Sequence, residues 1–276
     1  MNYRHHFHAG NFADLFKHAG LLAALTVLTA KGQPRLSVID THAGAGLYDL
    51  EGEAAQRSGE AAQGVGRLMA DAAAPQAFAA LKAAVRRRNT DGSLRYYPGS
   101  PLLTAEALRP GDRLCAFEWR SEDARVLQAA LGKAASNCEV VAGDGFAGAP
   151  ARLRAGDAAL VLIDPPFERG DDYERIVDCV GQVLTRAPAA SVMIWTPLKD
   201  LETFDRLLRR LEGLDPPPAL VGEARLRPLS QPMRMNGCAL ITINPPERLE
   251  PALRACGDWI VRVLGEAGGE ARLWTL

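Results

Sequence analysis

The chain has 276 residues, of which 47% are hydrophobic and 24% are charged, so its composition is that of a globular protein and excludes a disordered or fibrous chain. Its 32 Lys and Arg residues nearly balance 33 Asp and Glu residues, which gives a formal net charge of −1. This balance excludes a uniformly basic nucleic-acid coat, so any nucleic-acid site must be a local basic patch. Five cysteines without a C-x-x-C pair are typical of reduced thiols in a cytosolic protein.

The first residues do not resemble a targeting segment. Residues 1–10 are polar and rich in histidine, with no apolar stretch and no small-residue cleavage site. The apolar run at residues 21–30 is shorter than the roughly 20 residues that a membrane span needs. We therefore expect a cytoplasmic protein without a membrane partner. As a separate expectation, the protein is a monomer.

The hydrophobic pattern predicts helices in alternation with strands. Apolar residues at helical spacing predict a helix over residues 14–30, and RLSVID predicts a buried strand over residues 35–40. The alanine-rich residues 51–93 predict a small helical insertion, and another helix is expected to begin at Ser100. Six more strands are expected at residues 113–118, 138–142, 158–163, 191–196, 219–226 and 239–243, and helices between them at residues 121–131, 173–184 and 198–211.

Seven strands with helical crossovers predict an α/β fold, in which an open and mostly parallel sheet carries helices on both faces. The last two strands are joined by a polar loop without an obvious helix, which predicts an antiparallel hairpin at the end of the sheet. We expect residues 1–276 to form a single domain and residues 51–93 to form a helical insertion subdomain within it.

The first predicted strand runs into the glycine-containing segment of residues 40–46, DTHAGAG. In open parallel sheets, ligands bind at the carboxyl ends of the strands, and glycines such as Gly44 let the backbone approach a ligand closely. The third glycine of the dinucleotide-binding fingerprint is missing, because Tyr48 and Asp49 follow instead. The pattern therefore suits a nucleoside ligand without a pyrophosphate, although a glycine-rich turn without any ligand explains the glycines equally well.

The next two strands end in acidic residues. Glu118 ends the second strand, where a carboxylate can accept hydrogen bonds from both ribose hydroxyls. Asp144 lies between Gly143 and Gly145 after the third strand, which suits a carboxylate beside an adenine amino group. Taken alone, Glu118 is also compatible with a solvated surface residue, and Asp144 with a plain turn.

The fourth strand is followed by the most specific motif in the sequence, Asp164-Pro165-Pro166-Phe167. The prolines rigidify the backbone and donate no hydrogen bond, so the Pro165 carbonyl is an acceptor beside the Asp164 carboxylate. Phe167 adds a flat apolar face, and two acceptors with a stacking surface match the exocyclic amine of a flipped-out base. Two similar segments, at residues 215–217 and 244–246, are not followed by an aromatic residue.

Four of the five histidines lie in the first 18 residues, and the fifth is His42. A metal site is the obvious alternative interpretation of the early cluster, but no cysteine lies nearby and the first three histidines form no helical i, i+4 pair. We therefore expect no metal, and we interpret these histidines as contacts to adenosine or to RNA phosphates, beside Tyr3, Arg4 and Lys17.

The ordered strand ends resemble those of class I S-adenosylmethionine-dependent methyltransferases. Residues 164–167 are similar to the Asn/Asp-Pro-Pro-aromatic signature of enzymes that methylate exocyclic amines. More narrowly, the chain resembles the RlmJ family of bacterial 23S ribosomal RNA adenine-N6 methyltransferases, nearly from end to end and including the helical insertion. The segments that carry this resemblance are residues 3–18 (YRHHFHAGNFADLFKH), 40–46 (DTHAGAG), 94–101 (LRYYPGSP) and 163–167 (IDPPF).

The resemblance implies a Rossmann-like class I methyltransferase fold and methyl transfer from S-adenosylmethionine to the exocyclic N6 of an adenosine in 23S ribosomal RNA, with S-adenosylhomocysteine as product and no metal. It implies that Asp164 is the catalytic carboxylate, acting with Pro165 and Phe167, and that Tyr3, Arg4 and Phe167 contact the substrate. Phe167 stands where tyrosine is common in this motif, so stacking is kept and a hydroxyl contact is lost. The implied cofactor contacts are Lys17, His18, His42, Gly44, Ser100, Glu118, Asp144, Gly145 and Asp164.

Basic residues at 86–88 and Arg95 are further candidates for RNA contacts, although residues 86–88 also fit a solvated helix face. An adenine-N6 methyltransferase that acts on DNA or on another RNA would share residues 164–167, but the chain has no obvious target-recognition domain. The missing third glycine argues against a nicotinamide-dependent oxidoreductase. The intact motif argues against a non-catalytic RNA-binding module.

Overall fold

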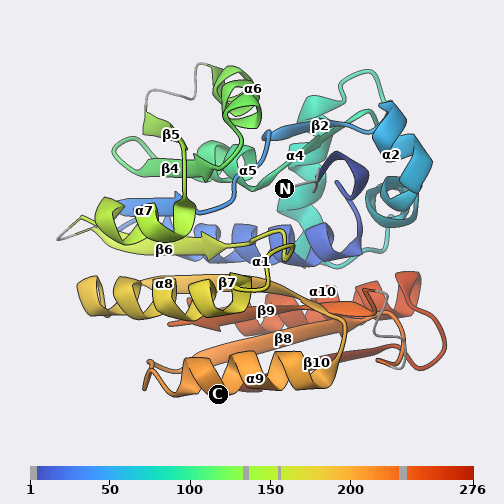
Figure 1. The fold of residues 1–276 in the computed structure, drawn as a ribbon. Helices are drawn as coiled ribbons and strands as arrows, with labels where there is room; N and C mark the ends of the chain where they lie inside the picture. The colour runs from blue at the N-terminus through green and yellow to red at the C-terminus, as the bar shows by residue number, and fades with distance from the viewer. Residues whose placement is uncertain (1–4, 133–136, 155–156, 230–234) are drawn as a thin grey trace.

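The structure, a computed structural model, describes residues 5–132, 137–154, 157–229 and 235–276. An eight-stranded sheet with helices on both faces forms its centre (Figure 1). The strand order is β10-β8-β9-β7-β6-β1-β4-β5. The strands are β1 (Leu36–Asp40), β4 (Arg113–Glu118), β5 (Cys138–Ala142), β6 (Ala158–Ile163), β7 (Ser191–Leu198), β8 (Ala219–Arg225), β9 (Gly237–Ile243) and β10 (Glu270–Thr275).

The sheet is parallel on one side of β7 and antiparallel on the other. β1 pairs in parallel with β4 and β6, β4 pairs with β5, and β6 pairs with β7. β9 runs antiparallel between β7 and β8, which confirms the hairpin expected for the last two predicted strands. The five residues of β1 are all buried, as expected for a central strand that is covered on both faces.

The predicted count of seven strands is wrong by one, because β10 adds an eighth strand antiparallel to β8. The sequence of β10, EARLWT, mixes charged and apolar residues, and its burial pattern contains no fully buried residue. Such a short, charged strand at the edge of a sheet carries a weak periodic signal, and its charges protect the open edge from pairing with other chains. All seven predicted strands are present, with bounds that differ by at most two residues.

Alternate residues of the central strands point into two buried clusters, one on each face of the sheet. On β4, Leu114 and Ala116 belong to one cluster, whereas Cys115 and Phe117 belong to the other. The first cluster is covered by α1 (Phe12–Leu28), α5 (Ser100–Ala107), α6 (Ser121–Leu131) and α10 (Leu249–Leu264). The second cluster is covered by α7 (Gly145–Arg152), α8 (Asp172–Arg186) and α9 (Leu201–Glu212).

Helix α1 begins two residues before the predicted start, because Asn11 caps it. The Asn11 Oδ1 atom accepts hydrogen bonds from the backbone N–H groups of Ala13 and Asp14, both at 3.0 Å. Asparagine is among the strongest N-cap residues, since its side chain satisfies N–H groups that have no partner within the helix. The cap fixes the register of a helix that carries three buried polar residues, Asp14, Lys17 and His18.

Residues 51–93 are largely helical, as predicted, and lie between β2 (Leu47–Asp49) and β3 (Tyr96–Pro98), which pair as two antiparallel strands. Phe78, Leu81 and Val85 of this segment lie in the same buried cluster as α1 and α10. This continuous packing supports our proposal that the chain is a single domain and that residues 51–93 are an insertion within it. The elements of the insertion are α2 (Glu53–Ser58), the π-helical turn η2 (Ala62–Gly66), α3 (Arg67–Ala70), the 3-10 turn η3 (Gln76–Phe78) and α4 (Ala79–Arg88).

The insertion lies directly against the backbone that precedes α1, where a further 3-10 turn, η1, spans His5–Phe7. The Val65 N–H donates to the Gly10 carbonyl at 2.8 Å. A Cβ atom on Gly64 would lie only 2.2 Å from that carbonyl oxygen and 2.8 Å from the Cα of Asn11. Glycine at position 64 is therefore required for this close approach.

We expect Gly64→Ala to lower the free energy of unfolding by about 1–3 kcal/mol, because the added methyl group forces two backbone segments apart. Urea unfolding followed by circular dichroism measures the change. Gly66→Ala in the same turn is the matched control, since its Cβ would lie 3.4 Å from the nearest neighbouring atom, the Ala61 carbonyl oxygen. Equal stability of the two variants would contradict the steric account.

Candidate functional site

A cavity of about 560 Å³ lies at the carboxyl ends of the parallel strands. It is lined by Gly44 after β1, Glu118 at the end of β4 and Asp164 after β6, together with residues of α1 and of the segment before it. This is the edge at which ligands bind in open α/β sheets. Other predicted site residues that line the cavity are Lys17, His18, His42, Ser100, Pro165 and Phe167.

Asp144 and Gly145 do not line this cavity but an adjoining one of about 20 Å³. His42, Trp119 and Pro166 line both cavities, so the two spaces are neighbours. The predicted substrate contacts Tyr3 and Arg4 lie outside the residues that the structure describes.

The turn after β1 is fixed by Glu118. One carboxylate oxygen accepts the Gly44 N–H at 2.9 Å and the other accepts the Arg120 N–H at 2.8 Å. Burial raises the pKa of Glu118, and these two hydrogen bonds oppose that shift. Gly44 has φ +63°, and a Cβ there would lie 2.2 Å from the Tyr48 hydroxyl oxygen, so only glycine fits this corner of the cavity.

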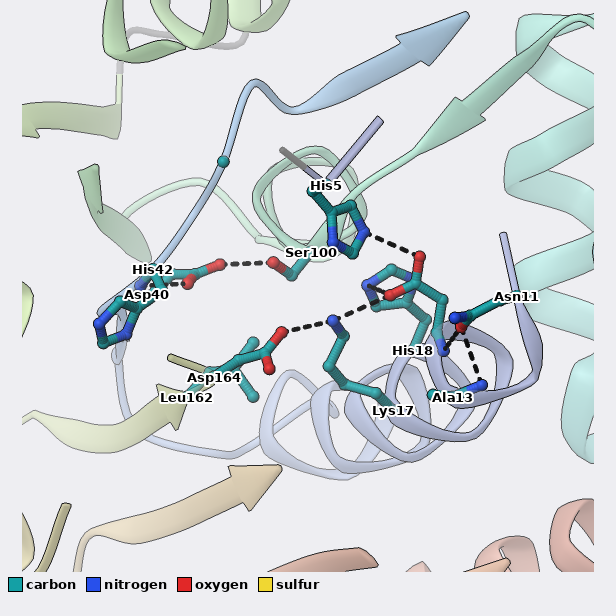
Figure 2. Close-up of polar contacts among 12 residues, drawn as sticks. His5, Asn11, Ala13, Lys17, His18, Asp40, His42, Ser100, Leu162 and Asp164 are labelled. Atoms are coloured by element: carbon teal, nitrogen blue, oxygen red, sulfur yellow. Dashed lines mark hydrogen bonds and ion pairs between the residues drawn. The ribbon is translucent and has the colours of Figure 1, made fainter. Parts of the chain in front are cut away.

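Lys17 connects helix α1 to the end of β6 (Figure 2). Its Nζ atom lies 2.5 Å from Asp164 Oδ2 and 2.9 Å from Asp14 Oδ1, and its side chain is 6% exposed. Burial alone would lower the pKa of Lys17, but the charges of Asp14 and Asp164 outweigh it and hold that pKa well above its usual value. The ammonium group therefore stays charged and fixes one oxygen of the Asp164 carboxylate.

Asp14 is fixed in turn by the segment before the helix. Its Oδ2 atom accepts the Gly10 N–H at 2.9 Å and lies 3.0 Å from His5 Nε2. Although burial opposes ionisation, the nearby His5 and Lys17 hold the pKa of Asp14 well below its usual value. A buried anion and a buried cation on one helix thus stabilise each other's charged form.

His18 and His42, which both line the cavity, are neutral. Burial lowers the pKa of His18 to about 3, and the same cause lowers the pKa of His42 to about 3. His18 Nδ1 lies 2.8 Å from the Tyr97 hydroxyl, and His42 Nδ1 lies 2.7 Å from the Thr41 hydroxyl. These two rings are suited to neutral hydrogen bonds with a nucleoside and not to charge pairing with phosphates.

Ser100 ties the first turn of α5 to the end of β1. Its hydroxyl donates to Asp40 Oδ2 at 2.7 Å, and the His42 N–H donates to the other oxygen at 3.2 Å. Burial raises the pKa of Asp40 to about 6, which these hydrogen bonds limit.

The segment after β6 presents an aromatic face to the cavity. Phe167 has φ +52°, a left-handed backbone conformation that is costly for a bulky residue and persists only when its surroundings hold it. Its ring centroid lies 5.0 Å from that of Tyr173 and 5.8 Å from that of Trp195. These aromatic neighbours support the ring at the edge of the cavity.

Three of the basic residues proposed for RNA contacts, Arg87, Arg88 and Arg95, are paired with acidic side chains. Arg87 and Arg88 both form ion pairs with Glu106, and Arg95 Nη2 lies 3.0 Å from Asp49 Oδ2. This pairing favours the solvated helix face over an RNA contact for residues 87 and 88.

Sequence reasoning missed the functional context of Asp14, which is the second partner of Lys17. The signal was present, since Asp14 and Lys17 are three residues apart in a mostly apolar helix and must share one face. It also missed Trp195 as a neighbour of Phe167, because no sequence pattern relates β7 to the turn after β6.

The part of the chain that the structure describes has neither a metal-binding cluster nor a membrane-crossing helix. No group of three or more His, Cys, Asp or Glu side chains there is arranged to hold a metal ion. Within the same residues, no helix combines the length and the apolar character that a membrane crossing requires.

The fold and the site define a class I S-adenosylmethionine-dependent methyltransferase, since the glycine turn, the acid at the end of β4 and the motif after β6 meet at one edge of the sheet. Residues 33–276 match the family described as ribosomal RNA large subunit methyltransferase D, RlmJ. The chain belongs to this RlmJ family of ribosomal RNA methyltransferases.

Individual relatives agree with this assignment over nearly the whole chain. The ribosomal RNA large subunit methyltransferase J of Escherichia coli is 35% identical over 269 residues, which is 97% of this chain and 95% of that protein. The Haemophilus influenzae protein of the same name is 33% identical, over 100% of this chain and 98% of its own. A crystal structure of a Legionella pneumophila protein has a TM-score of 0.86 and 27% identity, and the match covers 97% of this chain and 98% of that one.

The residues present fit S-adenosylmethionine. Position 44 allows no side chain, so the turn presents bare backbone to the cavity, and Glu118 lies beside it. A carboxylate at the end of the second strand of such a sheet is suited to ribose hydroxyls. The neutral imidazole of His42 lies between the two cavities and offers hydrogen bonds without a competing positive charge.

We expect Asp40→Asn to change how stability depends on pH. The pKa of Asp40 is about 6 in the folded protein and near 3.8 when unfolded, so its contribution to stability is complete below about pH 4 and is lost as the pH rises to about 6. Relative to the wild type, the variant should therefore gain about 3 kcal/mol in free energy of unfolding between pH 4 and pH 7, measured by urea unfolding at each pH.

Ser100→Ala provides a companion measurement. Removing the Ser100 hydroxyl eliminates a hydrogen bond that lowers the pKa of Asp40, so the upper end of the window should move to higher pH. A stability difference between wild type and Asp40→Asn that does not vary from pH 4 to pH 7 would refute this assignment.

Proposed function

We propose that this enzyme methylates the exocyclic N6 of an adenosine in 23S ribosomal RNA, acting as a monomer in the cytoplasm. The observation that carries the proposal is the position of the Asp164 carboxylate. It lies in the large cavity beside Pro165 and Phe167, at the edge that Gly44 and Glu118 also line. The relatives named as large-subunit RNA methyltransferases support this substrate, since 23S RNA is the main RNA of the bacterial large subunit.

The cofactor half of the site is assigned to the ends of β1, β4 and β5. Glu118 is assigned to the ribose hydroxyls, the Gly44 turn to close backbone contact, and Asp144 with Gly145 to the adenine ring. His18, His42, Ser100 and Lys17 complete the assigned set. S-adenosylmethionine supplies a methyl group on a positively charged sulfonium when it is bound, so the chain's own residues need only position and stabilise the acceptor.

The acceptor half is assigned to residues 164–167. The lone pair of an adenine amino group is delocalised into the ring, so the group is a poor nucleophile. Hydrogen bonds from its two N–H groups to Asp164 and to the Pro165 carbonyl would favour a tetrahedral nitrogen as the new bond forms. Positioning of this kind can lower a barrier by up to about 7–11 kcal/mol in the best intramolecular cases.

Lys17 gives the Asp164 carboxylate a fixed orientation. Because Lys17 Nζ holds Oδ2 at 2.5 Å, Oδ1 is left to accept a hydrogen bond from the substrate. The carboxylate then stabilises the positive charge that develops on the nitrogen, and after methyl transfer the nitrogen releases one proton to solvent. Phe167 provides the surface against which a flipped-out base stacks.

We expect Asp164→Ala to lower the rate of methyl transfer at least about a hundredfold and to leave binding of S-adenosylhomocysteine largely intact. The fold should survive, because Lys17 keeps Asp14 as a partner at 2.9 Å. The measurement is mass spectrometry of ribosomal RNA nucleosides from cells that carry the wild-type chain, the variant or neither. Asp178→Ala, on the exposed face of α8, is the matched control.

N6-methyladenosine in 23S RNA should depend on the wild-type chain and be lost with Asp164→Ala. Methylation at another atom, or of DNA in place of ribosomal RNA, would refute the proposed substrate. Near-normal turnover by Asp164→Ala would refute the proposed role of that carboxylate.

We expect Phe167→Ala to weaken capture of the target base more than Phe167→Tyr does, because tyrosine keeps the aromatic face. Loss of base stacking costs about 1–3 kcal/mol, so KM for a short RNA substrate should rise about fivefold or more in the alanine variant. Steady-state kinetics with a radiolabelled methyl group measures both variants. Equal KM values would count against a stacking role.

A further inference from the structure

The smaller cavity is lined by an ion pair between Arg175 of α8 and Asp144 at the start of α7, and Arg175 takes no part in the proposed function. Arg175 Nη2 pairs with Asp144 Oδ2, while Asp144 Oδ1 accepts the N–H groups of Phe146 at 3.1 Å and Ala147 at 3.4 Å. The carboxylate is therefore held on one side by the start of α7 and on the other by a guanidinium. Both partners line the cavity and are only partly exposed, 23% for Arg175 and 31% for Asp144.

Arg175 is itself held in place. Its guanidinium carbon lies 4.6 Å from the centroid of the Phe146 ring, and that ring meets His42 edge-on at 4.7 Å. Stacking on an aromatic face restricts the plane of a guanidinium, which gives its hydrogen bonds a defined direction. Through these contacts, Arg175 connects α8 to the turn after β1 and to the turn after β5. Both turns belong to the proposed cofactor site.

We propose that Arg175 is a positioning residue that sets the selectivity of this site for an adenosyl group, by holding the Asp144 carboxylate in a fixed orientation. The inference rests on the proposed function, in which Asp144 accepts a hydrogen bond from the adenine amino group. An ionised carboxylate can only accept hydrogen bonds, so it favours an amino group and disfavours a carbonyl oxygen at the same place. A carboxylate that is free to turn away would lose much of this discrimination.

The test compares two ligands that differ at the 6-position and at the adjacent N1, which is an acceptor in S-adenosylhomocysteine and carries a proton in S-inosylhomocysteine. S-inosylhomocysteine carries a carbonyl oxygen where S-adenosylhomocysteine carries the amino group. Isothermal titration calorimetry with the full-length chain gives Kd for each ligand and hence their ratio. We expect Arg175→Gln to reduce the preference for S-adenosylhomocysteine about tenfold, and Arg175→Lys, which keeps the charge without the planar fork, to retain part of it.

Arg169→Gln is the matched control. Arg169 lines the same cavity and loses the same charge in this variant, but its side chain pairs with Asp171 at 2.9 Å and 3.1 Å. The ligand preference should therefore stay at the wild-type value. Thermal unfolding of each variant verifies that it is folded, and Arg175→Lys keeps the test decisive where Arg175→Gln fails to fold.

Asp144→Asn separates the inference from the proposed function on which it rests. Loss of the preference in Asp144→Asn together with a wild-type ratio in Arg175→Gln overturns the role of Arg175 and leaves Asp144 as an adenine contact. An unchanged preference in Asp144→Asn overturns the assignment of Asp144 itself. If Arg175→Gln weakens the binding of both ligands equally, Arg175 has a merely structural role. If it tightens the binding of S-adenosylhomocysteine, Arg175 competes with the ligand for Asp144. Either result overturns the inference.

Discussion

A buried ammonium group shared by two carboxylates determines the geometry of the site. Removing Lys17, Asp14 and Asp164 from water is costly, and the cost is offset only while the three charges remain in contact. One of these carboxylates belongs to α1 and the other to the turn after β6. The position of the proposed catalytic group is therefore defined by a helix that lies 147 residues earlier in the chain, and not by its own strand alone.

The position of α1, and so of Lys17, depends in turn on contacts with the insertion. Asn11 caps the helix with its Oδ1 atom, while its Nδ2 atom donates to Glu60 Oε2 at 2.9 Å. His8 Nδ1 lies 3.0 Å from the other oxygen of Glu60. Burial would raise the pKa of Glu60, but the hydrogen bonds with His8 and Asn11 outweigh burial and lower that pKa. Glu60 of the insertion thus helps to fix where α1 begins, and the start of α1 determines where Lys17 lies in the cavity.

Much of the fold and part of the site follow from local patterns in the sequence. Buried strands such as β1 and β6 are continuous apolar runs, and the residues after them fall at one edge by topology alone, which explains why Gly44, Glu118 and Asp164 meet as predicted. The edge strand β10 was missed because its charges obscure its period. The pairing of Asp144 with Arg175 was missed because it joins two helices whose relative position depends on tertiary packing. The roles assigned to the site residues follow from family resemblance and from the chemistry of their side chains, because local sequence patterns specify helices and strands and not ligand contacts.

The close approach of η2 to the backbone of Gly10 has a consequence for engineering. Gly64 leaves no space between the two segments, so neither can be exchanged for a foreign sequence without disturbing the other. A chimera that transplants residues 51–93 into a related scaffold must carry residues 8–14 with it as one cassette. Conversely, deleting the insertion to shorten the chain would remove contacts that hold the start of α1. Because Lys17 of α1 contacts Asp164, the deletion would disturb the proposed catalytic site without changing any residue in the turns after the strands.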